Sequence, residues 1–148
     1  MGQAKVVSVN ISDTRGVRKR QVAEGRLKEG VGLVDDAHSG SARQVSLLAI
    51  ESIEKMRRKG LDVHPGDFAE NITTQGIDLL ALPIEIVLSV GASAVLRITE
   101  KGKVCHHRCD IYHQAGDCVM PREGIFAEVL TGGRIAAGDP IRVIEEER

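Results

Sequence analysis

The chain has very few aromatic residues, with no tryptophan, one tyrosine and two phenylalanines in 148 residues. Proteins that hold single-stranded nucleic acid stack the bases on aromatic side chains, so this scarcity argues against such a function. An excess of one charge is also absent, because 20 basic and 21 acidic residues leave a net charge of -1. We therefore expect no nucleic-acid partner, and any anion site must be a local one.

Long hydrophobic runs are missing as well. No apolar stretch approaches the roughly 20 residues that span a bilayer, and the first six residues hold no apolar signal core. We expect no membrane partner and a cytoplasmic protein. A chain with 42% hydrophobic residues is large enough to bury one core, which predicts a single domain over residues 1–148.

Cysteine is scarce and unevenly placed. All three cysteines, Cys105, Cys109 and Cys118, lie between residues 101 and 118 together with three of the five histidines. An odd number of cysteines in a reducing compartment favours thiol chemistry or metal ligation over a disulfide framework. This segment is therefore the first candidate for a site of chemistry.

Cys105 is the candidate reactive thiol of the segment, because nearby cations lower a thiol pKa and Lys101, Lys103 and Arg108 flank it. Two other interpretations stay open. Cys105 and Cys109 are four residues apart, so a helical turn would bring both sulfurs to one side as half of a zinc site. Cysteine is also a common core residue, and Cys118 in particular can be a buried side chain without chemistry.

Two further polar clusters lie upstream. Residues 35–44 contain two aspartates, His38 and Arg43 before a predicted helix. Such a cluster can bind a divalent cation, face an anion beside the helix N-terminus, or form a solvated turn. Residues 65–79 contain Glu70 and Asn71, a polar pair that needs hydrogen-bond partners if it is buried.

Most of the chain has the pattern of short strands. Alternation predicts half-buried strands over residues 7–11 and 84–90, the second opening a hairpin over about 84–100. Two more strands are expected over 125–130 and 141–144, with the turns at Gly132-Gly133 and Gly138-Asp139-Pro140 between them. One segment differs. Ser46 as N-cap, apolar residues at 47, 50, 53 and 56, the pair Glu51 and Lys55, and Gly60 as a stop predict a helix over about 47–59. We expect a mainly β (α+β) fold with this substantial helix and a second short one.

Taken together, the clusters resemble the MOSC domain, the module named for the C-terminal part of molybdenum cofactor sulfurases. The resemblance covers nearly the whole chain. It is carried by the order and spacing of Gly32 to Gly40 with Asp36 and His38, Arg43 to Leu48, Pro65-Gly66, Glu70-Asn71-Ile72, Leu82-Pro83, Lys103-Val-Cys105 and Glu123 to Val129. Where the family pattern favours glycine, this chain has Asp35, Ala69 and Glu85, for which a left-handed backbone is costly.

The resemblance implies a β-barrel and a function around the molybdenum cofactor. It implies that Cys105 carries sulfur or ligates molybdenum, with Cys109 and Cys118 as alternative thiols. A pterin phosphate needs cationic donors and the ring needs orienting hydrogen bonds. The candidates for these roles, which rest on the family pattern and on polarity, are His38, Arg43, Asn71, Arg108 and Arg122.

We therefore expect a domain that binds the molybdenum cofactor, or carries sulfur, in the sulfuration, biosynthesis or insertion of that cofactor. Its protein partner would be a sulfur donor or a molybdoenzyme. The MOSC module takes up the 148 residues and leaves no room for a pyridoxal-phosphate desulfurase domain, so catalysis stays an open question. Two alternatives remain: a small molybdenum-dependent reductase, and a zinc-binding or thiol-regulated interaction module.

Overall fold

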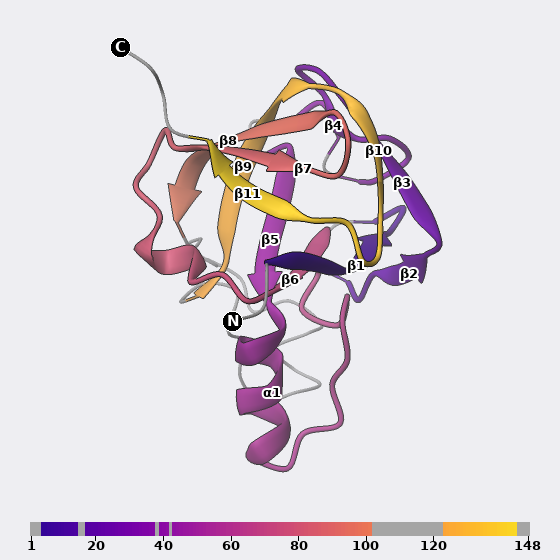
Figure 1. Ribbon diagram of the computed structural model, residues 1–148. Helices are drawn as coiled ribbons and strands as arrows, with labels where there is room; N and C mark the ends of the chain where they lie inside the picture. The colour runs from indigo at the N-terminus through magenta and orange to yellow at the C-terminus, as the bar shows by residue number, and fades with distance from the viewer. Residues whose placement is uncertain (1–3, 15–16, 38, 42, 102–122, 145–148) are drawn as a thin grey trace.

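A computed structural model of the protein describes residues 4–14, 17–37, 39–41, 43–101 and 123–144. Within these residues the fold is mainly β with one α-helix (Figure 1). The strands are β1 (Lys5–Ile11), β2 (Arg20–Val22), β3 (Glu24–Lys28), β4 (Gly32–Leu33), β5 (Val45–Ala49), β6 (Ile72–Gln75), β7 (Val87–Val90), β8 (Ala94–Lys101), β9 (Ile125–Thr131), β10 (Gly133–Ala136) and β11 (Ile141–Ile144). The helix α1 spans Ile50–Arg58, and the short 3-10 helix η1 spans Leu79–Ala81.

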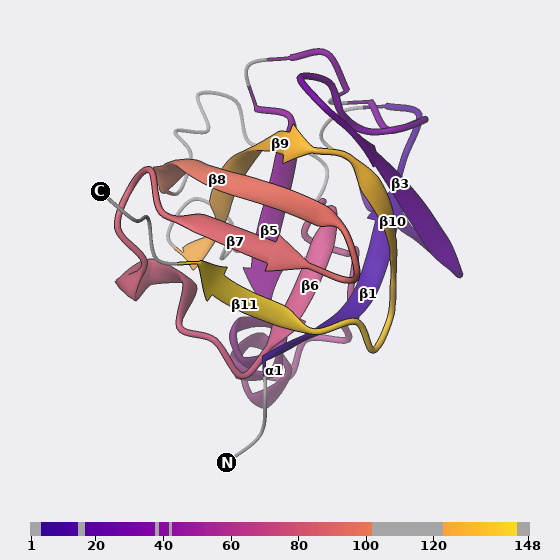
Figure 2. The ribbon, with the colours of Figure 1, turned by 45° about the horizontal axis from the view of Figure 1, so that its top comes forward.

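The described strands form two sheets. The larger has eight strands in the order β11-β7-β8-β9-β5-β6-β1-β2, and the smaller has three in the order β10-β3-β4. Figure 2 shows the larger sheet curling, so that β7, β8 and β11 lie in front of β5 and β6. Between β1 and the chain entering β11 there is one isolated bridge, Lys5 with Pro140, and a few backbone hydrogen bonds, such as that from the N–H of Val6 to the carbonyl oxygen of Asp139 at 2.8 Å. The described strands β1 and β11 form no ladder with each other. The sheet is therefore not closed into a barrel, and the barrel expected from the family resemblance is not confirmed.

The predicted strands are confirmed in β1, β9, β11 and the β7–β8 hairpin, except that the strand predicted over 84–90 begins only at Val87 because Glu85 has a left-handed backbone. The prediction that β1 is half-buried is wrong. Val9 is fully buried on one face, but Ser8 and Asn10 on the other face are buried too, because polar groups of β6 and of the residues just before it bond to Asn10. A bulge between Val6 and Ser8 also shifts the register, which places Val6 in the core.

The helix predicted over about 47–59 is confirmed over residues 50–58. Residues 45–49 form β5 instead, paired on one side with β9 and on the other with β6. Ser46 is consequently a buried strand residue and not the N-cap, a position that Ala49 occupies without a side-chain hydrogen bond. Gly60 at φ +95° ends the helix as expected. The spacing of Leu47, Ile50, Ile53 and Met56 misled because a buried strand that runs straight into a helix presents the same apolar pattern.

Two buried clusters stabilise the fold. The first draws on nearly every strand and includes Val9, Leu47, Leu88, Leu96 and Ile98. The second lies between the sheet and α1 and consists of Leu48, Ile53, Met56, Val63, Phe68, Ala69 and Phe126. Leu47 and Leu48 are neighbours in sequence but belong to different clusters, as expected for a strand covered on both faces.

The backbone is left-handed at three non-glycine residues among those described: Asp35 at φ 70°, Ala69 at φ 65° and Glu85 at φ 77°. These are the three positions at which the family pattern favours glycine. The turns therefore keep the glycine geometry although the side chains disfavour it, at a cost of roughly 1–2 kcal/mol each. Gly66 also has a left-handed backbone, at φ 93°, which glycine adopts without strain. A Cβ at this position would lie 2.5 Å from the carbonyl oxygen of Lys19.

Candidate functional site

The cysteine segment, residues 102–122, begins and ends on adjacent strands. Lys101 at the end of β8 is the ladder partner of Ile125 at the start of β9. The segment lies outside the described residues, and with it Cys105, Cys109, Cys118, Arg108 and Arg122; His38 also lies outside them. What the structure places is the base of the cysteine segment, formed by Arg43, Glu100, Lys101, Glu123 and Phe126.

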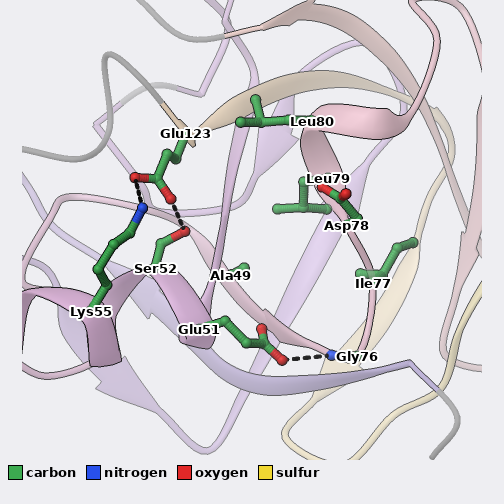
Figure 3. A pocket seen from close by; sticks show the side chains of 10 residues that line it. All are labelled: Ala49, Glu51, Ser52, Lys55, Gly76, Ile77, Asp78, Leu79, Leu80 and Glu123. Atoms are coloured by element: carbon green, nitrogen blue, oxygen red, sulfur yellow. Dashed lines mark hydrogen bonds and ion pairs between the residues drawn. The ribbon is translucent and has the colours of Figure 1, made fainter. Parts of the chain in front are cut away.

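A pocket of about 420 Å³ adjoins this base (Figure 3). Its walls come from the first turns of α1, from residues 76–80 and from Glu123. Lys101 lies against it as well, because its Nζ donates a hydrogen bond of 2.8 Å to the carbonyl oxygen of Leu80. Both ends of the cysteine segment are thus attached beside the pocket.

The polar groups of the pocket bridge its walls. Glu123 accepts hydrogen bonds from Lys55 Nζ at 2.7 Å and from Ser52 Oγ at 2.8 Å. Glu51 Oε2 accepts one from the backbone N–H of Gly76 at 3.1 Å. The predicted ion pair between Glu51 and Lys55 is therefore replaced by two contacts that tie α1 to the chain before β9 and to the end of β6 (Figure 3).

Arg43 is the one predicted cationic site residue that the structure describes. Its Nε and Nη2 donate to Glu100 Oε1 and Oε2 at 3.2 and 2.7 Å, and its guanidinium lies 5.1 Å from the ring centre of Phe126. The hydrogen bonds to Glu100 raise the pKa of Arg43, so it stays charged. Because Glu100 already holds the guanidinium, an anion binding there has to displace or share it.

Asn71, the other described site candidate, is fully buried. Its Oδ1 accepts from the backbone N–H of Ser46 at 3.0 Å, and its Nδ2 donates to the carbonyl oxygen of Asn10 at 3.3 Å. The side chain thereby joins β5 and β1 across the start of β6. In this structure Asn71 serves the scaffold, and its role in orienting a ligand stays a prediction.

Glu70 has the most unusual environment of the described acids. It is fully buried, and its Oε2 accepts hydrogen bonds from the N–H of Gly66 at 3.0 Å and from Thr73 Oγ1 at 2.7 Å. Its Oε1 has no hydrogen-bond partner among the described residues. Burial raises the pKa of Glu70 to about 7, although the bonds from Gly66 and Thr73 act in the opposite direction. The sequence indicates that a buried Glu70 needs hydrogen-bond partners, but not that Oε1 has none among the described residues.

A buried ion pair was not predicted at all. Lys19 Nζ lies 2.8 Å from Asp36 Oδ1 and 2.9 Å from Ser12 Oγ, and neither charged side chain is exposed. Asp36 belongs to the cluster before α1, so its polarity was noticed. Lys19 stands in a basic run with Arg18 and Arg20, which has the appearance of a solvated stretch, and nothing in the sequence marks it as buried.

Neither a metal-binding cluster nor a membrane-spanning helix is present among the described residues. Among the described residues no group of three or more histidine, cysteine or acidic side chains is placed to hold a metal ion. A zinc site would thus depend on the cysteine segment. None of the described helices has the length and apolar character needed to cross a membrane.

Solved structures with the same fold come from several bacteria. The YuaD protein of Bacillus subtilis has a TM-score of 0.80 at 21% identity, covering 99% of this chain and 98% of its own. YiiM of Geobacillus stearothermophilus has a TM-score of 0.73 at 20% identity, covering 96% and 75%. YiiM of Escherichia coli has a TM-score of 0.72 at 19% identity, covering 99% and 72%. At these identities the likeness shows the fold alone.

A search of curated protein sequences gives no significant match. The model of the MOSC domain, in contrast, matches residues 34–142. That range begins just before the polar cluster ahead of α1, includes the whole cysteine segment and ends within β11. The chain belongs to the MOSC domain family, a family associated with the molybdenum cofactor.

Proposed function

We propose that this chain binds the molybdenum cofactor, or carries sulfur for it, through Cys105 and in contact with a sulfur donor or a molybdoenzyme. One observation carries the proposal. In a MOSC domain, the segment that contains Cys105 is attached at both ends beside the 420 Å³ pocket. We propose that this thiol meets a ligand held between the sheet and α1.

The pocket has the size of a small-molecule site, and parts of its lining suit a cofactor of this class. Its volume lies within the roughly 300–1,000 Å³ typical of small-molecule sites. Leu79 and Leu80 offer an apolar wall for a flat ring, and the carboxylates of Glu51 and Asp78 offer acceptors for the N–H groups of a pterin. The first turn of α1, which has no side-chain cap, offers backbone N–H groups to a phosphate.

Other residues complete the proposed assignment. Arg43, held by Glu100 beside the base, is the described guanidinium available to a phosphate, and Arg108 and Arg122 are its proposed helpers. His38 and Asn71 are proposed to orient the ligand, Asn71 through the backbone of β5 that it fixes. When bound, the cofactor supplies a molybdenum centre, for which the soft thiolate of Cys105 is a suitable ligand.

As a sulfur carrier, Cys105 would accept one sulfur atom from a donor persulfide by thiol exchange. Its thiolate attacks the terminal sulfur of a donor persulfide, the donor's sulfur–sulfur bond breaks, and the donor leaves as a thiolate while Cys105 becomes the persulfide. Lys101 and Lys103 favour the attacking thiolate by their charge. No external oxidant is needed, because the donor persulfide already contains sulfur at the required oxidation level.

The binding proposal is tested by purifying the protein from a host that makes the cofactor and measuring molybdenum, zinc and pterin in the same sample. We expect molybdenum and pterin in equal amounts from a binding domain. One equivalent of zinc without pterin would contradict the proposal and support a zinc module. Reductase activity with a low-potential electron donor would identify a small molybdenum enzyme instead.

The residue is tested by mass spectrometry after exposure to a persulfide donor. We expect one added sulfur on the peptide that contains Cys105, and none in Cys105→Ser. Cys109→Ser and Cys118→Ser are the matched controls, and both should keep the modification. Modification that follows Cys118 instead would move the site to that thiol.

A further inference from the structure

We infer that Glu70 is a positioning residue whose proton holds the loop between α1 and β6, residues 59–71, against the base of the cysteine segment. The structural part of this inference stands without a bound ligand. Its meaning for regulation rests on the proposed function, because the same base carries the Cys105 segment. The group that acts is a single buried carboxyl, and the element that responds is the loop that it fixes.

The geometry joins the carboxyl to the loop directly. Glu70 Oε2 holds the N–H of Gly66, four residues earlier in the same loop, and the hydroxyl of Thr73 on β6. Because Oε2 already accepts two hydrogen bonds, a proton on the carboxyl resides on Oε1, the oxygen without a partner among the described residues. Neutral Glu70 therefore closes the loop without burying a charge.

No described cation compensates the carboxylate once that proton is lost. Arg18 in the preceding segment is paired with Asp67 at 2.8 Å, and the ammonium of Lys19 is held by Asp36 and Ser12. His64, on the exposed side of the loop, faces Asp62 and Asp67. The side chains that bond to Glu70 are neutral: Thr73 Oγ1 donates to its carboxyl, and Asn10 Nδ2 donates to its backbone carbonyl oxygen.

Loss of the proton therefore leaves a buried charge whose Oε1 has no hydrogen-bond donor among the described residues. Opening of the loop lets water reach that oxygen, so the charged form favours the open state. The raised pKa of Glu70, about 7, places this change near neutral pH. Such an opening is governed by local stability and needs no unfolding of the sheet.

The loop reaches the base through one buried contact region. Phe68 in the loop is fully buried and belongs to the same cluster as Phe126 of β9. Arg43 lies over the Phe126 ring and is held there by Glu100. Withdrawal of Phe68 would remove a large side chain from the cluster that includes the Phe126 ring, so the proton on Glu70 would affect how firmly Arg43 is held at the base.

The chain offers a direct assay because Phe68 and Phe126 are its only phenylalanines. Incorporation of 4-fluorophenylalanine gives two fluorine NMR signals, assigned with Phe68→Leu and Phe126→Leu. In the protein without cofactor we expect both signals to change with one common midpoint near pH 7. Glu70→Gln, which mimics the protonated carboxyl at every pH, should abolish the change. Amide exchange of residues 64–71 should accelerate above the same midpoint in the unsubstituted protein only.

Three control variants keep the test specific. His64→Gln and Asp67→Asn alter other titratable groups of the loop and should leave the transition in place. Thr73→Val removes a hydrogen bond that favours the carboxylate, so it should raise the midpoint, which provides a test even if Glu70→Gln does not fold. Signals that are constant from pH 5 to 8.5, or a transition that survives in Glu70→Gln, would overturn the inference while leaving the proposed function untouched.

Discussion

Replacement of Lys19 by methionine should strongly destabilise the protein. The substitution keeps an unbranched side chain of nearly the same length but removes the ammonium that lies 2.8 Å from the buried Asp36 carboxylate. At the observed 2.8 Å the gross attraction is about 6 kcal/mol for an effective dielectric constant of 20, before the cost of desolvation is subtracted. Removing one partner of a buried pair typically costs about 3–5 kcal/mol, because the remaining charge stays in the interior.

The cost should be measured by urea unfolding followed by far-ultraviolet circular dichroism, since the chain has no tryptophan. Small proteins are stable by about 5–15 kcal/mol, so the expected loss is a large part of the total. Lys19→Met combined with Asp36→Asn should recover part of it, because the amide oxygen still accepts from the N–H of Ser12, as Asp36 Oδ1 does at 3.0 Å.

The matched control is Arg134→Met, which breaks the exposed pair with Glu24 at 3.5 Å. Exposed pairs contribute about 0–1 kcal/mol, so this variant should be nearly neutral. Lys19→Met could instead lower the unfolding free energy as little as Arg134→Met does, or the added Asp36→Asn could bring no recovery. Either result would mean that removing the ammonium of Lys19 does not leave a costly buried charge on Asp36. The reasoning from burial would then be refuted.

Three further outcomes follow from the geometry. The pKa of Glu70 is about 7 in the folded protein and lies above its unfolded value, so the folded state holds the proton more tightly. The unfolding free energy should therefore fall by about 1.4 kcal/mol per pH unit between pH 4.5 and 7. Glu70→Gln should remove that slope in urea titrations. Glu85→Gly should raise the unfolding free energy by up to about 1 kcal/mol as left-handed strain is relieved, whereas Glu85→Ala, with the same strain, should bring no gain. Asn71→Ala should cost about 1–3 kcal/mol in the same assay, because the buried N–H of Ser46 loses its acceptor; an unchanged midpoint would show that another group replaces it.

The alternation of apolar and polar residues was sufficient to predict which side chains are buried where only one face of a strand meets the core. Leu96 and Ile98 alternate with polar residues and are buried as expected, because side chains alternate across a strand and only one face of β8 packs inside. The same rule failed for β1 and β5, since both are covered on two faces. Nothing in the alternation of Ser8 and Asn10 announces that polar groups from distant strands will cover them.

The candidate site was predictable in composition but not in position. The cysteines and Arg43 stood out by residue type, and the family pattern placed them in one domain. The pairing of Arg43 with Glu100 and the burial of Lys19 depend on contacts between residues far apart in sequence, which no local pattern contains. The left-handed turns at Ala69 and Glu85 became predictable only by comparison with a pattern that has glycine there.

The adjacency of Lys101 and Ile125 in the ladder makes the cysteine segment a separable module. A rigid hairpin fixes the distance between its two attachment points, so closing the loop costs chain entropy that grows only with the logarithm of its length. Halving or doubling the segment changes that cost by only about 0.6 kcal/mol. Lineages can therefore exchange the thiol-bearing sequence, and engineers can graft a different one, while the sheet that supports it keeps its own stability.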